Sequence, residues 1–314
     1  MNPNTKIFLA GYQGLIGSAL HRRLRSDGYQ NILVKTRQEL DLSDAAAVRE
    51  FFETHRPEVV FLAAGRVGGI TANLNYPAEF ITQNLEIQLN VIRESHRTDV
   101  KRFIFFGSSC MYPRECAQPM REMDLLTGIP ESSSLPYAIA KLSGLQMCLA
   151  YNRQYQKSVF IPVIPNNAYG PFDDFDPASS HVLSALLRRF HEAKINGAPE
   201  VTLWGSGSPR REFIFSDDIA DACLFLIQQE KLPELPVNIG IGVDHSIKEV
   251  AEVIAKIVGF EGRLGFDTSK PDGAPRKLLD STRIQQLGWK AKVSLEAGIR
   301  MTYDWYLTEG QALA

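Results

Sequence analysis

The sequence has few cysteines, and they are not arranged to bind a metal. Its four cysteines, Cys110, Cys116, Cys148 and Cys223, include no CxxC pair and no Cys/His cluster at the spacing of a zinc site. The sequence therefore predicts neither disulfide bonds nor a bound metal ion.

Long apolar runs and an excess of charge of either sign are also missing. No apolar run approaches the roughly 18 residues of a membrane-spanning helix, and the first five residues lack the basic and apolar pattern of a signal peptide. The formal net charge of -2 gives no general attraction to nucleic acid or to a membrane surface. We expect a cytoplasmic protein that binds neither nucleic acid nor membrane and that holds an anionic ligand with local basic groups.

The pattern of short apolar and amphipathic segments predicts the fold. The 314 residues are enough for one large or two modest domains. In the first half, apolar strands alternate with helices, which is typical of a parallel sheet covered on both faces. The expected strands cover residues 7–10, 32–35, 59–64, 103–107 and 158–164, and the expected helices cover 15–27, 45–55, 78–97 and 137–155. The predicted class is α/β, a doubly wound parallel sheet of the Rossmann type with a second, smaller α/β substrate domain.

The second domain begins after Pro165, where the chain becomes rich in Pro, Gly, Asn and Asp. Beyond it the sequence predicts a helix over residues 180–192 and a strand over 211–215 that passes back toward the first domain. We therefore expect interleaved domains. Residues 1–165, joined by about 211–240, form the dinucleotide domain, and residues 166–210 and 241–314 form the substrate domain.

A glycine-rich turn at Gly11, Gly14 and Gly17 lies between the first strand and the first helix. Glycines in this setting let the backbone approach a pyrophosphate, and the helix N-terminus presents free N–H groups and a partial positive charge to it. Such turns also occur without a nucleotide, which is the alternative interpretation.

The end of the second predicted strand indicates which dinucleotide is bound. Lys35 and Arg37 stand where an NAD site usually has a carboxylate for the ribose hydroxyl. Basic groups there favour a 2′-phosphate and therefore NADP(H). Glu39 and Asp41 are close in sequence, so a solvated strand end is the alternative.

Tyr137 and Lys141 are four residues apart on a predicted helix, which places both side chains on one face. A neighbouring ammonium favours the phenolate and lowers the tyrosine pKa, so that Tyr137 can donate a proton to an oxygen that gains charge as a hydride arrives. Ser108, at the end of the fourth strand, can donate to the same oxygen. Together these residues predict hydride transfer from a dinucleotide to a carbonyl group.

With these motifs, the chain resembles the GDP-L-fucose synthase family of extended short-chain dehydrogenases. The similarity runs nearly end to end and rests on residues 63–70, 76–80, 107–113, 137–141, 180–183, 187–193, 204–207, 211–213 and 269–277. The resemblance implies an NADPH-dependent epimerase-reductase that converts GDP-4-keto-6-deoxymannose to GDP-L-fucose, by epimerisation at C3 and C5 followed by reduction of the C4 keto group.

The resemblance also implies further site residues. It adds Cys110 and His181 to the catalytic groups, because a thiolate and an imidazolium on opposite faces of the sugar can remove and return the acidic C3 and C5 protons. Without the resemblance, the two would be a buried strand-end cysteine and a polar residue at a helix start. For the GDP moiety it implies Arg189, Trp204, Arg211 and Asp272, with Asn167 near the sugar and the nicotinamide. The predicted cofactor contacts are Gly11, Gln13, Gly14, Leu15, Ile16, Gly17, Arg37, Asp41, Leu42, Ala64, Ser108, Lys141, Pro165, Asn166, Asn167, Ala168 and His181.

Other functions remain open on the sequence. The chain departs from the family pattern at Gln13, Leu135, Asn166, Ala168 and the pair 215–216, mostly around the expected sugar pocket. A related GDP-4-keto sugar of the colitose or 6-deoxyheptose pathways is therefore an alternative substrate. A sugar-nucleotide 4-epimerase with permanently bound NAD and a non-catalytic NADP-binding module are further alternatives. By analogy with the family, residues 78–97 and 137–155 are expected to pair two copies into a homodimer.

Overall fold

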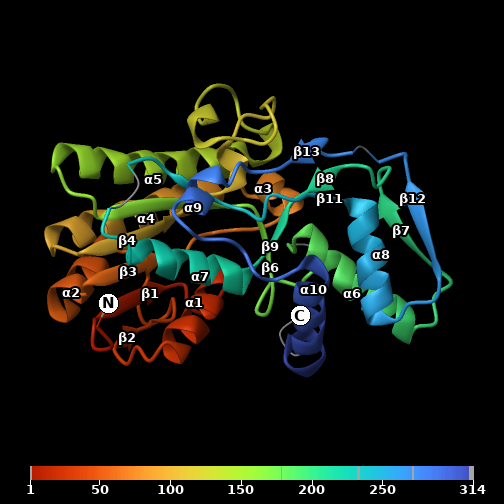
Figure 1. Ribbon diagram of the computed structural model, residues 1–314, viewed down its shortest axis with the longest axis horizontal. Helices are drawn as coiled ribbons and strands as arrows, with labels where there is room; N and C mark the ends of the chain where they lie inside the picture. Colours follow the sequence, from red (N-terminus) through yellow and green to blue (C-terminus); the bar gives the residue numbers. More distant parts are fainter. Residues whose placement is uncertain (1, 178, 232–233, 271, 311–314) are drawn as a thin grey trace.

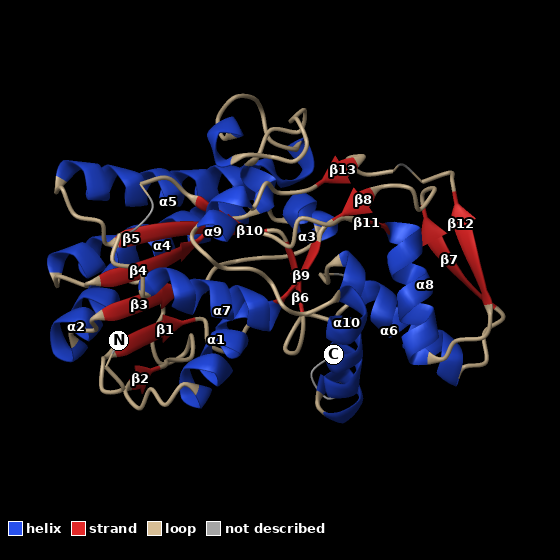
Figure 2. Cartoon of the chain, viewed as in Figure 1, coloured by secondary structure: helices blue, strands red, loops and turns tan. Residues whose placement is uncertain are grey.

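The structure is a computed structural model that describes residues 2–177, 179–231, 234–270 and 272–310. At its centre lie β1 (Ile7–Ala10), β2 (Ile32–Leu33), β3 (Val59–Leu62), β4 (Arg102–Phe106), β5 (Phe160–Pro165) and β10 (Val237–Ile239). These strands form one parallel sheet in the order β10-β5-β4-β3-β1-β2 (Figures 1 and 2). The predicted doubly wound parallel sheet is confirmed, although β10 was not foreseen and β2 stops two residues before Lys35.

Helices bury both faces of this sheet. In β1, Ile7 and Leu9 belong to one apolar cluster and Phe8 and Ala10 to the other, because successive side chains of a strand point to opposite faces. The first face is covered by α1 (Leu15–Ser26) and α7 (Ser216–Ile227). The second is covered by α2 (Ala45–His55), α4 (Pro77–Arg97) and α5 (Leu135–Gln154). This double cover explains why the strands are continuously apolar.

A third apolar cluster forms the smaller part of the molecule, on the right in Figure 1. It contains α6 (Val182–Ile195), α8 (Ile247–Val258) and α10 (Leu295–Thr308), together with the parallel strand pair β7 (Glu200–Trp204) and β12 (Arg263–Asp267). Short strands β8 (Arg210–Arg211), β11 (His245–Ser246) and β13 (Arg276–Lys277) form a three-stranded sheet, and β6 (Asn167–Tyr169) pairs with β9 (Phe213–Phe215). The remaining helices are α3 (Ile70–Asn75), α9 (Thr282–Gln286) and three short 3-10 turns, η1 (Ser109–Met111), η2 (Glu122–Asp124) and η3 (Ser132–Ser134).

The prediction of a single strand over residues 211–215 is wrong. Arg211 belongs to β8, whereas the residues from Phe213 onward belong to β9 in a different sheet. Glu212 lies between them and is fully buried, and its carboxylate accepts hydrogen bonds from the backbone N–H groups of Gly242 (2.7 Å) and Leu279 (3.0 Å). The chain changes sheets at this residue, whose carboxylate is bonded to two segments that come later in the sequence.

The chain passes between the two parts more than once. After α6 it returns to the large sheet, where α7 packs on α1 and β10 lies beside β5. Trp289, still later in the sequence, packs in the same cluster as Ile7. The large sheet is therefore completed by residues from the second half of the chain.

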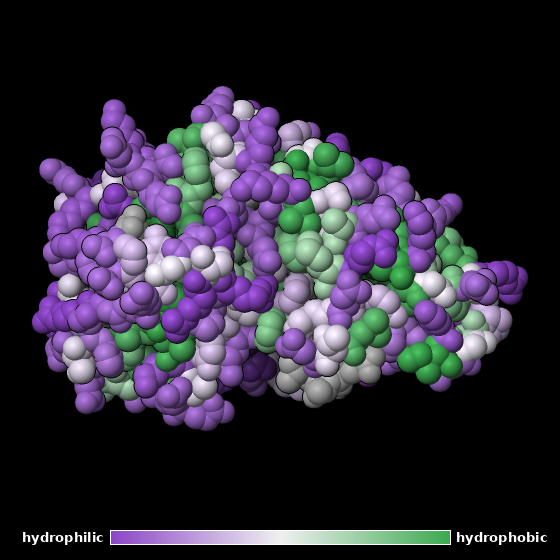
Figure 3. Space-filling view, turned by 60° about the horizontal axis from the view of Figure 1, so that its bottom comes forward, coloured by the Kyte–Doolittle hydropathy of each residue, from purple (hydrophilic) through white to green (hydrophobic). Residues whose placement is uncertain are grey.

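Several helices begin with residues that favour a helix start. Asp44 caps α2 by accepting hydrogen bonds from two backbone N–H groups, Ser246 and Glu249 form a capping box at the start of α8, and Pro136 lies in the first turn of α5. None of the helices within the described residues is long and apolar enough to cross a membrane. The face of the molecule in Figure 3 is largely hydrophilic, with scattered apolar groups.

Candidate active site

The carboxyl ends of the central strands bring most of the predicted cofactor residues to one edge of the sheet. Gly11 follows β1, Ala64 lies just beyond β3, Ser108 follows β4 and Asn166 follows β5. Because these strands are parallel and in register, their carboxyl ends meet at the same edge, which is where doubly wound sheets hold ligands.

The three glycines of the turn differ in how much space a side chain would have. Gly11 has φ +82°, and a Cβ there would lie 2.6 Å from the backbone nitrogen of Ala64. A Cβ on Gly17 would lie 1.9 Å from the carbonyl oxygen of Gly11. Gly14 is exposed, and the nearest atom to its Cβ position is 3.7 Å away. The fold therefore needs Gly11 and Gly17, whereas Gly14 leaves open space at the N-terminus of α1, where a phosphate can approach the backbone.

The basic residues after β2 each have a carboxylate nearby. Lys35 Nζ is 3.5 Å from Glu39, and Arg37 Nε is 3.9 Å from Asp41, with the Arg37 side chain 71% exposed. Exposed pairs at such distances are weak. Arg37 is consequently free to turn toward an added phosphate, although it is not without an acidic neighbour.

Tyr137, Ser108 and Lys141 lie together at the edge of the sheet. The side chains of Tyr137 and Ser108 are hydrogen-bonded. Lys141 Nζ donates to the carbonyl oxygen of Phe106 at 2.9 Å and lies 5.9 Å from the centroid of the Tyr137 ring. A Cβ on Gly65, just after β3, would be 3.6 Å from the same Nζ, so the ammonium faces the end of β3 as well.

The electrostatics of this group differ from the sequence-based expectation. Burial raises the pKa of Tyr137, a negative charge on Cys110 raises it further, and the hydrogen bond to Ser108 lowers it. Burial also lowers the pKa of Lys141 to about 8. The predicted lowering of the tyrosine pKa by Lys141 is not seen, because burial outweighs it and the ammonium bonds to a backbone carbonyl.

Cys110 lies close to both Tyr137 and Arg211. It belongs to η1, where its backbone N–H donates to Ser108 Oγ at 3.3 Å. Burial lowers the pKa of Arg211 and raises that of Tyr137, and the sulfur of Cys110 is near enough to act electrostatically on both groups. The structure thus gathers Ser108, Cys110, Tyr137 and Arg211 around one location.

The loop that precedes His181 contacts the loop that follows β3. His181 is the N-cap residue of α6, exposed, and it follows a loop in which the carbonyl oxygen of Ser179 accepts a hydrogen bond from Gly69 N at 2.9 Å. Gly69 lies between β3 and α3, and a Cβ there would be 3.1 Å from the carbonyl oxygen of Ser180. This backbone contact, which we call the loop clasp, ties the histidine loop to the large sheet.

Two of the predicted substrate residues are cations without a carboxylate partner among the described residues. Arg189 donates to the carbonyl oxygen of Thr202, and Arg211 donates to those of Arg210 (2.8 Å) and Ala274 (2.7 Å). Burial lowers the pKa of both arginines. Arg189 is exposed and Arg211 is half-buried, and guanidinium groups that bond to neutral carbonyls keep their charge for an anion.

Trp204 and Asp272 lie next to each other in the smaller part. The Trp204 side chain is exposed, and Lys270 Nζ lies 5.8 Å from the centroid of its ring. The Asp272 carboxylate accepts hydrogen bonds from Ser206 N (2.9 Å) and Ser206 Oγ (2.7 Å), which holds its loop against the turn after β7. The exposed indole face is available to a planar ring, whereas Asp272 fixes the turn.

The sequence did not single out every residue that shapes this region. Asn84, buried on α4, accepts from Arg66 N at 3.2 Å and donates to Arg66 O at 3.0 Å, which fixes the segment after β3. Glu212 lies in the segment 211–213 that carries the family resemblance, but no function was predicted for it. Neither had a local signal, because their partners are distant in the sequence.

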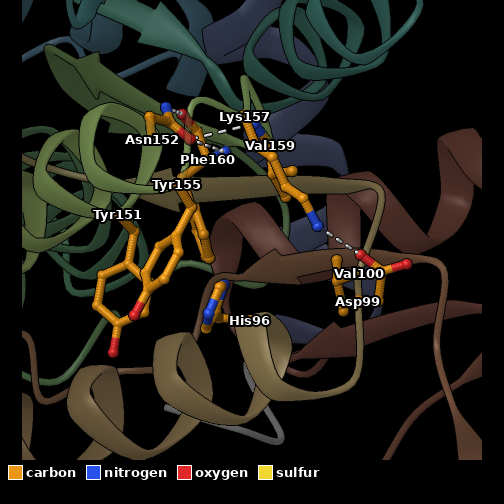
Figure 4. Close-up of a pocket in the computed structure, with 9 residues that line it drawn as sticks. All are labelled: His96, Asp99, Val100, Tyr151, Asn152, Tyr155, Lys157, Val159 and Phe160. Carbon is orange, nitrogen blue, oxygen red and sulfur yellow. Dashed lines mark hydrogen bonds and ion pairs between the residues drawn. The ribbon is translucent and has the colours of Figure 1, made fainter.

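A separate hollow lies at the opposite, amino end of the strands (Figure 4). The rings of His96 and Tyr155 stack there with centroids 4.0 Å apart, at the last turns of α4 and α5. The Asn152 amide is bonded to the backbone at the start of β5, and Lys157 pairs with Asp99 at 3.0 Å. Its polar groups are engaged with one another, and it lies away from Ser108, so it is not the candidate active site.

Comparison with known proteins places these features in context. Residues 7–240 match the family described as "NAD dependent epimerase/dehydratase family". The chain is 49% identical over 310 residues to the GDP-L-fucose synthase of Escherichia coli (strain K12), with 96% of each chain covered. It is 52% identical over 304 residues to GDP-L-fucose synthase 1 of Arabidopsis thaliana, covering 97% of this chain and 94% of that one. A solved GDP-mannoheptose C4 reductase from Campylobacter jejuni, with NADP bound, is 42% identical with a TM-score of 0.90 over 98% of this chain and 100% of that one.

Proposed function

The chain belongs to the NAD dependent epimerase/dehydratase family and, within it, to the GDP-L-fucose synthases, and on that basis we propose that it is an NADPH-dependent epimerase-reductase. It converts GDP-4-keto-6-deoxymannose to GDP-L-fucose. The sugar is epimerised at C3 and C5, and the keto group at C4 is then reduced. The observation that carries the proposal is the grouping of Ser108, Cys110, Tyr137 and Lys141 at the edge of the sheet that the glycine turn adjoins.

The residues at this edge fit an NADP(H) molecule. Gly14 leaves room beside the N-terminus of α1 for the pyrophosphate, and Arg37 is exposed where a 2′-phosphate would lie. NADPH, when bound, supplies the hydride for the C4 carbonyl. Lys141, held by the Phe106 carbonyl, adds positive charge beside that position.

Tyr137 and Ser108 carry the proton for the reduction. The Ser108 hydroxyl is close enough to the Tyr137 phenol to lower the tyrosine pKa, so the proposed oxygen of the substrate can lie beside both. Because burial keeps the phenol protonated at neutral pH, Tyr137 enters the reaction as a proton donor. The donated proton goes to the C4 oxygen as it becomes a hydroxyl.

Cys110 and His181 carry out the epimerisation. The C4 ketone makes the hydrogens on C3 and C5 acidic, and the proposed thiolate of Cys110 removes one while the imidazolium of His181 returns a proton to the opposite face. The position of Cys110 beside Tyr137, and the clasp that brings the His181 loop to the same edge, support these roles.

The GDP moiety is held by the smaller part of the molecule. The uncompensated guanidinium groups of Arg189 and Arg211 suit the diphosphate, and the exposed Trp204 ring suits the base. Asp272 holds the turn that follows the tryptophan. Asn167, whose side chain donates to the carbonyl oxygen of Glu212 at 2.9 Å, is assigned to the sugar. We also propose a homodimer formed through α4 and α5 and a cytoplasmic location.

The test is to incubate the chain with NADPH and GDP-4-keto-6-deoxymannose in D2O and to identify the product by NMR. GDP-L-fucose labelled at C3 and C5 is expected. Cys110→Ser should abolish the label while NADPH still binds, and Tyr137→Phe should keep the label but slow reduction by roughly 10²- to 10⁴-fold. Persistent exchange in Cys110→Ser would transfer the base role to another residue.

A second candidate function is reduction of a GDP-4-keto-heptose. The observation that favours it is the 42% identity to the Campylobacter GDP-mannoheptose C4 reductase over nearly the whole chain. Faster turnover of a heptose substrate than of GDP-4-keto-6-deoxymannose in the same assay would establish it in place of the first.

A further inference from the structure

Three polar side chains form a row of hydrogen bonds from the interior to the edge of the large sheet. Glu212 and Asn166 are buried, whereas Asn167 is half-buried and begins β6. The Asn166 amide donates to the Glu212 carboxylate, and its Oδ1 accepts from Asn167 Nδ2 at 3.0 Å. Asn166 follows β5 as Ser108 follows the neighbouring β4, so the outer end of the row lies at the edge that carries the candidate active site.

The Glu212 carboxylate determines which way the Asn166 amide faces. The backbone N–H groups of Gly242 and Leu279 donate to its two oxygens, at 2.7 Å and 3.0 Å, so its neighbours are hydrogen-bond donors. A carboxylate can only accept, and the Nδ2 group of Asn166 must therefore face it. Asn166 consequently turns its Oδ1 toward Asn167.

The Asn167 amide is oriented in turn by two acceptors. Its Nδ2 donates to Asn166 Oδ1 and to the carbonyl oxygen of Glu212 at 2.9 Å, which uses both hydrogens of the amide. Its Oδ1 lies on the other side of the amide, and no described residue donates a hydrogen bond to it. Asn167 therefore has an acceptor, and not a donor, left for a ligand.

We propose that Asn166 is a positioning residue that holds Asn167 with its carbonyl oxygen toward the ligand, so that the site accepts a hydrogen bond there from an O–H or N–H group. The proposal rests on the proposed function, in which Asn167 is assigned to the sugar. The donor is a hydroxyl of the sugar or the carboxamide of the nicotinamide, and separate measurements with the two ligands distinguish them. The competing explanation is that Asn166 only holds the end of β5 against Glu212 and contributes to stability alone.

A double-mutant cycle of Asn166→Ala and Asn167→Ala tests the proposal. A residue that acts through Asn167 has no further effect once the Asn167 amide is gone, whereas a purely structural residue acts equally in both backgrounds. We expect Asn166→Ala to lower kcat/KM for GDP-4-keto-6-deoxymannose by roughly three- to tenfold in the parent chain. The loss is partial because Asn167 keeps its bond to the Glu212 carbonyl oxygen. In the Asn167→Ala background the same substitution should change kcat/KM by less than about twofold, and equal losses in both backgrounds would overturn the proposal.

The two ligands are then measured separately in Asn166→Ala. A higher KM for the sugar nucleotide assigns the acceptor to a sugar hydroxyl, and a higher Kd for NADPH in isothermal titration assigns it to the carboxamide. Unchanged values of both constants would overturn the proposal in favour of the structural role.

Asn152→Ala is the matched control at the other end of the same strand. The Asn152 side chain donates to Phe160 O at 2.7 Å and accepts from Val159 N at 3.1 Å and Phe160 N at 3.0 Å, so it holds the start of β5 as Asn166 holds the end. We expect the control to lower the midpoint of urea unfolding and to leave kcat/KM within about twofold of the parent. A loss of kcat/KM as large as that of Asn166→Ala would show that any loosening of β5 has this effect, which also overturns the proposal.

Two further arms keep the result decisive. If Asn166→Ala does not fold, Asn166→Ser takes its place in the cycle with the same expectations, because its short hydroxyl side chain can face the Glu212 carboxylate but cannot span from there to Asn167. If the parent chain does not reduce the sugar nucleotide, the proposed function fails, and NMR of isotope-labelled asparagine side chains decides the inference instead. Asn166→Ala should then speed the exchange of the Asn167 amide protons with solvent, and unchanged exchange would overturn the proposal.

Discussion

At the residue scale, the buried ammonium of Lys141 lowers the stability of the fold, which is the cost of its proposed role in the reaction. Its side chain is buried, and burial lowers its pKa from 10.5 to about 8. The unfolded lysine keeps its proton up to about pH 10.5, so the unfolded chain binds more protons than the folded chain between these two values. Keeping the ammonium protonated in the fold below pH 8 therefore costs on the order of 3 kcal/mol, and this cost disappears as the pH rises toward 10.5.

We accordingly predict that Lys141→Met stabilises the protein at pH 7 while removing reductase activity. The gain should be about 2 kcal/mol, because the substitution also loses the hydrogen bond to the Phe106 carbonyl, worth roughly 1 kcal/mol. Urea unfolding at pH 7 and pH 10 measures it, and the gain should shrink at the higher pH. A variant that is less stable than the parent at pH 7 would contradict the assigned burial cost.

At this scale, the residues that could be predicted are those that a local sequence pattern places at a strand end or on a helix face. The spacing of Tyr137 and Lys141 and the position of Ser108 after a strand were enough to expect them at one edge. The direction of the Tyr137 pKa shift was not predictable, because it depends on burial by the whole fold. Glu212 was missed because nothing in the local sequence distinguishes a buried carboxylate from an exposed one.

At the element scale, the turn between β1 and α1 separates the glycines that the fold needs from the one that leaves room for a ligand. Gly14→Ala should leave the free energy of unfolding within about 0.5 kcal/mol of the parent. The backbone conformation at this position suits alanine, and the atom nearest to the new methyl group is 3.7 Å away. NADPH affinity should nevertheless fall at least roughly tenfold, since the methyl group occupies the approach to the helix N-terminus.

Gly17→Ala is the matched comparison at the same turn. Its Cβ would lie 1.9 Å from Gly11 O, so we expect a loss of stability of several kcal/mol or failure to fold. Equal loss of stability in both variants, or undiminished NADPH affinity in Gly14→Ala, would show that the turn does not bind the pyrophosphate. Isothermal titration and urea unfolding give the two readouts.

Most elements around the large sheet could be predicted because their apolar periodicity is local, and the predicted and observed ends of α1, α2, α4 and α5 differ by two residues at most. The short strands of the smaller part could not. β8, β11 and β13 have two residues each, so their only signal is the partner strand, which comes from a distant segment.

At the scale of the whole molecule, Glu212 joins segments that the chain order keeps apart. Its carboxylate accepts from Asn166 Nδ2 after β5, from Gly242 N after β10 and from Leu279 N after β13. Glu212→Gln replaces one acceptor oxygen by a donor that faces N–H groups. We predict a loss of roughly 2–5 kcal/mol in urea unfolding. Glu261→Gln, at an exposed glutamate, is the control and should unfold like the parent. Equal unfolding midpoints for the two variants would show that Glu212 does not hold these segments together.

The loop clasp has a consequence for how such a molecule can change its substrate. The bond between Gly69 N and Ser179 O uses main-chain atoms on both sides, so it is indifferent to most side chains in the histidine loop. Residues of that loop can be exchanged during divergence without relocating the imidazole. A pocket built in this way can be reshaped for a different hexose or heptose while the atoms that move protons stay where they are.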